Sequence, residues 1–253
     1  MQFLKSAEAR LRRLRDRWLS PWRYRGDAVH CPLCSGDFNR FLPAGTGPRA
    51  RPDAVCPRCR SRERDRLAWL FLQARGERLL WRHMQFLHLA PEPRLGAWLQ
   101  ARIGEGYITA DLVRRDVMVR LDLQCMQYPN ETLDAIYCSH VLQDVPDDRR
   151  ALAECHRVLR PGGWGIFNVP LYAAATREGA PPGRPRRPRD RRPAEHLREY
   201  GPDYRERLRA AGFAVEVLGP QDLEPDPQQR RRLGIAGERC GCVHFVRRPA
   251  AAA

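Results

Sequence analysis

From residue 82 onward, the chain alternates between short apolar runs and segments with helical periodicity. The strand-like runs are 83–90, 107–112, 133–140, 163–170, 213–219 and 240–249, and the helical segments are 93–104, 147–159 and 202–212. Apolar runs without strict polar alternation are typical of strands that are covered on both faces. This order of elements predicts an α/β fold with a doubly wound sheet, and it constrains the architecture more than any other feature of the sequence.

Two Cys-x-x-Cys pairs precede this region. Cys31-Pro-Leu-Cys34 and Cys56-Pro-Arg-Cys59 are separated by 21 residues. Two such turns place four thiolates at the corners of a tetrahedron, the geometry that zinc prefers. Because four protein ligands leave no open coordination position, we expect a structural Zn²⁺ ion; an iron–sulfur centre and a module that has lost its metal are the alternatives. His30 is a competing ligand candidate, although we expect it to be a bystander.

These patterns divide the 253 residues into four segments. They are a basic amphipathic helix (1–22), a four-cysteine zinc-ribbon-like module (23–60), a connecting helix (61–81) and a main domain (82–253). We expect the connecting helix to begin at Ser61 as N-cap and to end near Gly76. Residues 177–193 are rich in Arg and Pro and lack periodicity, which predicts a flexible insertion in the main domain.

The charge of the chain favours an anionic partner. The 45 basic and 30 acidic residues give a net charge of +15. Such an excess is typical of proteins that bind nucleic acid or an anionic surface. Lys5 is the only lysine, however, so 44 of the 45 basic residues are Arg, and this bias is also typical of proteins encoded by GC-rich genomes.

The N-terminal segment raises the question of membrane contact. Phe3, Leu11 and Trp18 recur at helical spacing among several arginines. This helix either docks on its own domain or on a second copy, or makes a peripheral membrane contact. No apolar run reaches the length of about 18 residues that a transmembrane segment needs. The N-terminus also lacks the pattern of a signal peptide, so we expect a cytoplasmic protein.

The sequence resembles class I S-adenosylmethionine-dependent methyltransferases, in particular those with a methyltransferase type 11-like domain behind a zinc-ribbon-like segment. The resemblance rests on "YRGDAVHCPLC", "VCPRCRSRERDRLAWLFL", "LHLAPEPRL", "YITADL", "LDAIYCSHVLQDVPDDRRALAECHRVLRPGGWGIFNVP" and "HLREYGPDYRERLRAAGFAVEV", and it covers roughly residues 23–175 and 194–218. It implies that residues 82–253 form a Rossmann-like domain with a seven-stranded sheet and that the methyl donor is S-adenosyl-L-methionine.

The resemblance also implies a set of cofactor-binding residues. Asp111 corresponds to the acid that holds the ribose hydroxyls, and its position 21 residues after Ala90 agrees with the spacing of such acids. Asp122, with Leu123 beside it, corresponds to the acid that faces the adenine amine. Ser139 lies where the transferred methyl group meets the acceptor.

The first loop departs from the usual pattern of these enzymes. "HLAPEPRL" has no glycine where many class I methyltransferases have a Gly-rich loop, so the backbone approaches the cofactor less freely. Glu92 either faces the amino group of the cofactor or caps the helix that follows. His88 takes a position that is often acidic in related enzymes, and we expect a buried, hydrogen-bonded histidine that also borders the cofactor site.

His140 and Asp144 are the candidate catalytic residues, because the resemblance places them nearest the acceptor. Asp144 stands where related enzymes often have His. The predicted function is methyl transfer to an unidentified acceptor, with a small molecule, sugar or glycan favoured. An RNA methyltransferase that uses the zinc module and an Arg-rich surface is one alternative, and a degenerate, non-catalytic scaffold is another. The zinc module either completes the domain by packing on the connecting helix or reads the substrate.

Overall fold

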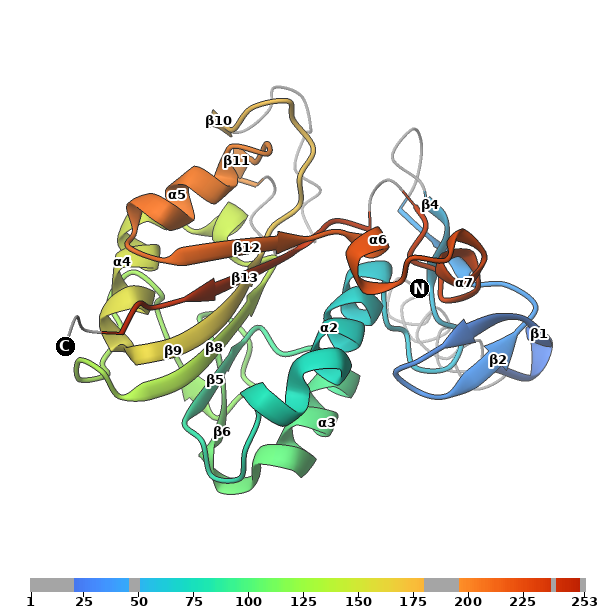
Figure 1. Cartoon of the computed structure of the whole chain (residues 1–253), viewed down its shortest axis with the longest axis horizontal. Coiled ribbons are helices and arrows are strands. Elements are labelled where there is room, and N and C mark those ends of the chain that lie inside the picture. The colour runs from blue at the N-terminus through green and yellow to red at the C-terminus, as the bar shows by residue number, and fades with distance from the viewer. Residues whose placement is uncertain (1–20, 46–50, 180–195, 238–239, 251–253) are drawn as a thin grey trace, which may run out of the picture. The chain divides into compact units, whose positions relative to one another are not determined.

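The computed structural model describes residues 21–45, 51–179, 196–237 and 240–250 (Figure 1). The chain forms two compact units, of which the first comprises Met1–Ala74 and Pro220–Cys240 and the second Arg75–Gly219 and Gly241–Ala253. Residues 1–20 of the predicted N-terminal helix and residues 180–193 of the predicted insertion lie outside the described residues. The membrane contact and the flexible insertion therefore stay predictions.

Two short hairpins form the first part of the first unit. β1 (Arg25–Cys31) pairs with β2 (Gly36–Phe38), and β3 (Leu42–Ala44) pairs with β4 (Arg51–Val55), both in antiparallel fashion. One cysteine pair begins at the end of β1 and the other directly after β4. Each pair therefore lies in a turn whose position is set by a hairpin.

A buried arginine joins these hairpins to the rest of the first unit. Helix α2 (Glu63–Leu79) begins in this unit, and α6 (Pro220–Leu223) and α7 (Pro227–Arg232) return to it. The buried guanidinium of Arg66 donates to the carbonyl oxygens of Ala54, Ser61 and Gly234. These bonds tie Pro220–Cys240 to the first unit, which differs from the predicted assignment of the whole of 82–253 to the main domain.

A seven-stranded sheet forms the centre of the second unit, with the strand order β12-β13-β9-β8-β5-β6-β7. The strands are β5 (Phe86–Leu89), β6 (Tyr107–Asp111), β7 (Val119–Arg120), β8 (Leu133–Ser139), β9 (Leu159–Asn168), β12 (Ala214–Leu218) and β13 (Val243–Arg247). β13 is antiparallel to β9 and to β12, and the other neighbours pair in parallel. The predicted doubly wound α/β fold is confirmed.

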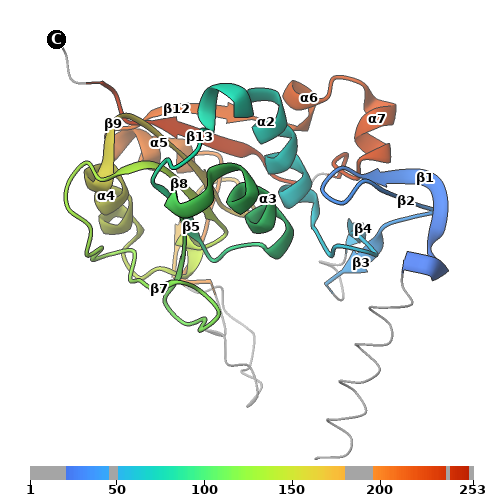
Figure 2. The same ribbon diagram turned by 90° about the horizontal axis from the view of Figure 1, so that it is seen from below.

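Helices cover both faces of this sheet (Figures 1 and 2). α4 (Asp148–Val158) and α5 (Tyr204–Ala210) pack into one apolar core with β8 and β9, through side chains such as Leu152, Cys155 and Leu208. α3 (Pro93–Ile103), followed by the short helix η2 (Gly104–Gly106), lies on the other face and buries Leu99 and Ile103. The 3-10 helix η3 (Leu142–Asp144) and the small β10 (Arg177–Glu178) and β11 (Arg198–Glu199) pair complete the unit. No helix among the described residues is long and apolar enough to cross a membrane.

Three predicted boundaries were wrong. α2 continues past Gly76 to Leu79, because glycine in a helix costs only about 1 kcal/mol and the carbonyl of Leu79 accepts a hydrogen bond from the indole of Trp164. Ser61 is not the N-cap of α2, since its hydroxyl contacts the sulfurs of Cys31 and Cys59. β9 begins at Leu159, four residues before the predicted strand-like run 163–170.

Candidate functional site

The carboxyl ends of three parallel strands meet at one edge of the sheet. β5 lies between β6 and β8, and their registers align Ala90, Asp111 and Ser139 along this edge. The chain passes from β5 to β6 and later returns to β8 on the opposite side of β5. This edge is therefore a topological switch point, where doubly wound sheets bind their ligands.

The turn after β5 has a strained backbone. Ala90 has φ of 48°, in the left-handed region that glycine usually occupies, and its N–H donates to the carbonyl of Ala110 at 2.9 Å. The left-handed conformation costs a non-glycine residue roughly 1–2 kcal/mol. The sequence lacks the expected glycine, yet the loop adopts the backbone conformation that glycine favours.

A buried hydrogen-bond chain holds Glu92 at this turn. Nδ1 of the fully buried His88 lies 2.7 Å from the Tyr107 hydroxyl, and Nε2 lies 2.9 Å from a carboxylate oxygen of Glu92. Burial, and then the charge of Glu92, raise the pKa of Tyr107, so its hydroxyl keeps its proton and donates to Nδ1. Nε2 then carries the imidazole proton and donates it to the carboxylate. Glu92 occupies the N-cap position of α3, but its side chain makes no capping hydrogen bond to the helix.

Asp111 and Asp122 each hold their own loop. Oδ1 of Asp111 accepts from the N–H groups of Val113 and Arg114, at 2.7 and 2.9 Å. Oδ1 of Asp122 accepts from the N–H of Gln124 at 2.9 Å, and Leu123 is buried beside it. Among the described residues, Oδ2 of Asp111 has no hydrogen-bond partner, so this oxygen is available to a ligand.

The end of β8 carries the predicted catalytic residues. The hydroxyl of Ser139 is buried and has no hydrogen-bond partner in the described part of the chain. His140 has φ of 56°, and its N–H donates to the carbonyl of Asn168 at 2.7 Å. Asp144 lies in η3, where its Oδ1 is 2.9 Å from Nδ1 of His196 and its Oδ2 accepts from Nε2 of Gln143. The sequence analysis did not single out His196, since no local pattern relates it to a residue 52 positions earlier.

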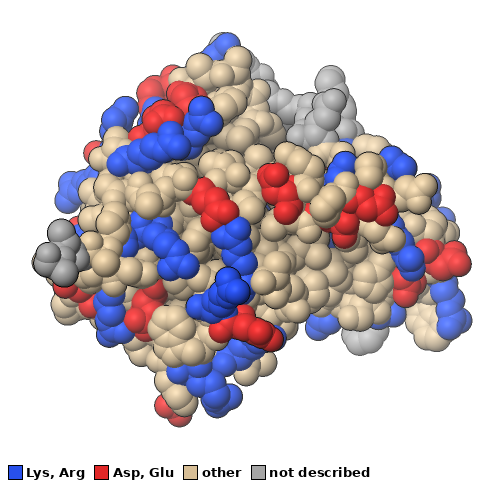
Figure 3. Space-filling view, in the orientation of Figure 1, with Lys and Arg blue, Asp and Glu red and all other residues tan. Residues whose placement is uncertain are grey.

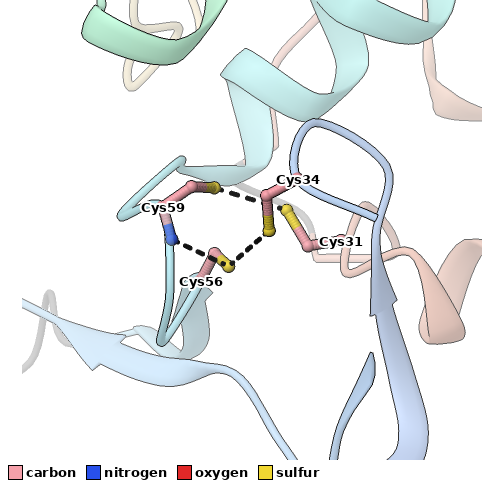
Figure 4. A group of neighbouring side chains, drawn as sticks. All are labelled: Cys31, Cys34, Cys56 and Cys59. Carbon is pink, nitrogen blue, oxygen red and sulfur yellow. Dashed lines mark hydrogen bonds between the residues drawn. The ribbon is translucent and has the colours of Figure 1, made fainter. Parts of the chain in front are cut away.

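The four predicted metal ligands converge in the first unit (Figure 4). The sulfurs of Cys31, Cys34, Cys56 and Cys59 all lie within 4.8 Å of one another, with 3.6 Å between Cys31 and Cys59 and 3.7 Å between Cys34 and Cys56. A tetrahedral zinc site with Zn–S bonds of about 2.3 Å has sulfurs about 3.8 Å apart, so the donor set fits Zn²⁺. His30 is not part of the cluster and bonds to Asp37 instead.

The residue that follows each cysteine pair has the same left-handed backbone conformation. Ser35 and Arg60 directly follow the second cysteine of each pair and have φ of 50° and 64°. The N–H of Cys59 donates to the sulfur of Cys56 at 3.4 Å. Such N–H groups stabilise thiolates, which a metal ion requires as ligands.

The comparisons with known proteins agree with this fold. Residues 102–167 match the family model described as a methyltransferase domain. The chain is similar to an S-adenosylmethionine-dependent methyltransferase from Mesorhizobium loti, with 20% identity over 72% of this chain and 98% of that chain and a TM-score of 0.50. It is also similar to the 1,6-didemethyltoxoflavin-N1-methyltransferase of Burkholderia thailandensis, with 18% identity over 74% of this chain and 78% of that chain and a TM-score of 0.50. No curated protein matches the sequence.

At these identities the solved structures establish the fold, and the family match supports methyltransferase activity. The matched residues run from the end of α3 through β6 and β8 to β9, so they include Asp111 and Ser139 of the switch-point edge but not Ala90. This match favours an enzyme over a non-catalytic scaffold. Residues 102–167 of the second unit therefore match a methyltransferase domain, and this match together with the fold supports an S-adenosylmethionine-dependent methyltransferase.

Proposed function

We propose that this enzyme methylates a small molecule, sugar or glycan, with S-adenosylmethionine held at the carboxyl ends of β5, β6 and β8. The observation that carries the cofactor site is the pair of carboxylates on adjacent strand ends. Glu92 and Asp111 each have one oxygen fixed by the protein and a second oxygen without a partner among the described residues. A carboxylate with one oxygen fixed and the other free is suited to binding the hydroxyl or ammonium group of a ligand.

The residues of this edge fit the cofactor. Asp111 would hold the ribose hydroxyls, Glu92 would face the amino group, and Asp122 with Leu123 would border the adenine. His88 has both ring nitrogens engaged, so it would act by orienting Glu92. The sulfonium of the cofactor supplies an already activated methyl group, and the protein chiefly aligns the acceptor with it.

The charges near the end of β8 support an acceptor without a phosphate backbone. The buried Arg198 and the neighbouring Arg207 both pair with Asp148 and Glu178. On the face drawn in Figure 3, basic and acidic side chains are interspersed. Nucleic-acid binding depends on unpaired Lys and Arg side chains that neutralise phosphates, and paired arginines supply little of that attraction.

Titration calorimetry of S-adenosylmethionine tests the cofactor site. Asp111→Ala should weaken binding about 10- to 100-fold, the loss expected for a hydrogen bond to a charged group. Glu105→Ala provides a matched control, because Glu105 is an exposed acid in η2, at the opposite end of β6. Equal affinities in wild type and Asp111→Ala would contradict the assignment.

We propose that the four cysteines hold a structural zinc ion that completes the first unit. The side chain of Arg66 lies 4.0 Å from the ring centroid of Phe41 and bonds to Ala54, so the helix packs directly on the module. Four sulfur ligands leave no position for a substrate. The zinc then stabilises the fold.

The alternative, RNA methylation, is favoured by one feature of the first unit. A cavity of about 970 Å³ there is lined by four arginines: Arg40, Arg51, Arg231 and Arg232. Of these, Arg51 is paired with Glu63 and Arg232 with Asp37. Binding of an RNA oligonucleotide that falls steeply between about 50 and 200 mM salt, and that weakens in Arg231→Ala, would favour this alternative.

A further inference from the structure

We propose that His196 is the general base of this methyltransferase, that Asp144 orients it, and that the acceptor atom is a hydroxyl oxygen. This inference rests on the proposed function of the switch-point edge. It adds a residue to the site and narrows the acceptor to a small molecule, sugar or glycan that is methylated on oxygen.

The contacts of Asp144 assign the tautomer of His196. Oδ1 of Asp144 lies 2.9 Å from Nδ1 of His196, and Oδ2 accepts from the amide Nε2 of Gln143 at 2.9 Å. A carboxylate that faces two nitrogens acts as the acceptor for both, so Nδ1 of His196 carries the imidazole proton. The lone pair of a neutral imidazole then resides on Nε2, as in the Ser-His-Asp arrangement of hydrolases.

The chain holds this pair firmly against the end of β8. The N–H of Leu197 donates to the carbonyl of Gln143 at 2.8 Å. The buried guanidinium of Arg198 donates to the carbonyl of Leu142 in η3 and to those of Val145 and Pro146 directly after it. A base needs a fixed position, and these four bonds fix the residues directly after His196.

Gln143 links the pair to the strand end itself. Its amide also donates to the carbonyl of His140, at 2.5 Å, and His140 directly follows the last residue of β8. The imidazole is therefore tied through Asp144 and Gln143 to the place where the transferred methyl group is expected.

The exposure of the pair suits an acceptor that arrives from solvent. The side chain of His196 is 44% exposed and that of Asp144 is 40% exposed, and Nε2 of His196 has no partner in the part of the chain that the structure describes. Leu197, which directly follows His196, has an exposed apolar side chain, and Tyr172, whose N–H donates to the carbonyl of Tyr200, is exposed as well. Aromatic and apolar surface of this kind packs against the faces of sugar and aromatic rings.

The presence of a base indicates the chemistry of the acceptor. A neutral amine already offers a lone pair, whereas an alcohol keeps its proton at neutral pH and is a weak nucleophile until that proton is removed. In the step, the acceptor oxygen bonds to the methyl carbon, the carbon–sulfur bond breaks with its electron pair on sulfur, and the hydroxyl proton moves to Nε2 of His196. The atoms and charges balance without a further reactant.

The test has two parts: the tautomer of His196 is determined by NMR, and the rate of methyl transfer is measured in a separate assay. In ¹⁵N-histidine-labelled protein, NMR should show His196 with the proton on Nδ1, and Asp144→Asn should shift the population toward Nε2–H. A proton on Nε2 in the wild type overturns the proposal whatever the turnover. Histidine signals are assigned from their loss in His196→Gln.

Turnover is measured with labelled S-adenosylmethionine on methyl glycosides and phenols, with the corresponding amines as matched compounds. His196→Gln should lower transfer to the hydroxyl compounds about 100- to 10,000-fold and leave the affinity for S-adenosylmethionine unchanged. Undiminished transfer to a hydroxyl compound, or transfer to amines alone, overturns the proposal. Failure of the wild type to bind S-adenosylmethionine would instead refute the proposed function, so the two failures are distinguishable.

Discussion

Replacing His88 with leucine removes the central member of the chain Tyr107–His88–Glu92. The two ring nitrogens of this buried histidine lie 2.7 Å from the Tyr107 hydroxyl and 2.9 Å from the Glu92 carboxylate. A buried polar group that loses its partner costs about 1–3 kcal/mol. Tyr107 is buried and bears that full cost, whereas the Glu92 side chain is 15% exposed and regains some hydration. We therefore expect His88→Leu to lower the free energy of unfolding by about 2–4 kcal/mol.

A double-mutant cycle tests the physical reason for this loss. In the wild type, Tyr107→Phe leaves the buried Nδ1 of His88 without its partner and should lower the free energy of unfolding by about 1–3 kcal/mol. In the His88→Leu background, the same change removes an unpaired hydroxyl and should raise it by a similar amount. Urea denaturation followed by circular dichroism measures all four variants, with the exposed Tyr172→Phe as control. If Tyr107→Phe destabilises both backgrounds equally, the hydroxyl is not coupled to His88 and the reasoning fails.

Two further predictions concern metal and pH. The purified protein should contain one zinc ion by mass spectrometry of metals, and Cys56→Ser or a strong chelator should destabilise the first unit, since metal binding and folding are coupled. A metal-free protein of unchanged stability would contradict the structural role. His244 is buried, and burial lowers its pKa from 6.5 to about 4. The unfolded chain therefore binds one more proton than the folded chain between these pH values, so the free energy of unfolding should fall as pH drops through this window, by up to about 3 kcal/mol. His244→Phe should flatten this part of the stability profile, and an unchanged slope would contradict the prediction.

Local patterns predicted six of the seven strands of the main sheet and the helices α3, α4 and α5, but not their arrangement. Each apolar run between residues 83 and 249 contains an observed strand, because burial on both faces of a sheet requires such runs. The insertion of β13 between β9 and β12 arises from pairing between segments far apart in the chain. Periodicity carries no information on such pairing. The resemblance to class I methyltransferases did imply a seven-stranded sheet, and the sheet has that number of strands.

In the first unit, too, the sequence predicted a local feature but not the long-range packing. The spacing of the cysteines was sufficient to predict that their sulfurs converge, since the spacing itself determines the two turns. It did not reveal that Pro220–Cys240 packs with this unit, because that grouping depends on single contacts such as the bond from Arg66 to Gly234. Ser61 was misassigned for the same reason. Its hydroxyl had two competing partners, a helix end and the sulfur cluster, and only the fold shows which one it contacts.

Two strained residues show that the absence of glycine from the first loop does not argue against a ligand site there. Ala90 and His140 both follow strands of the switch-point edge, and both have positive φ without being glycine. Each is held by a hydrogen bond to a neighbouring strand, from the N–H of Ala90 to Ala110 and from the N–H of His140 to Asn168. These bonds offset a strain of about 1–3 kcal/mol at each position, a cost that persists only where the surroundings enforce the conformation. Such strain concentrates at ligand sites, so the backbone after β5 and β8 points to a binding edge even though "HLAPEPRL" contains no glycine.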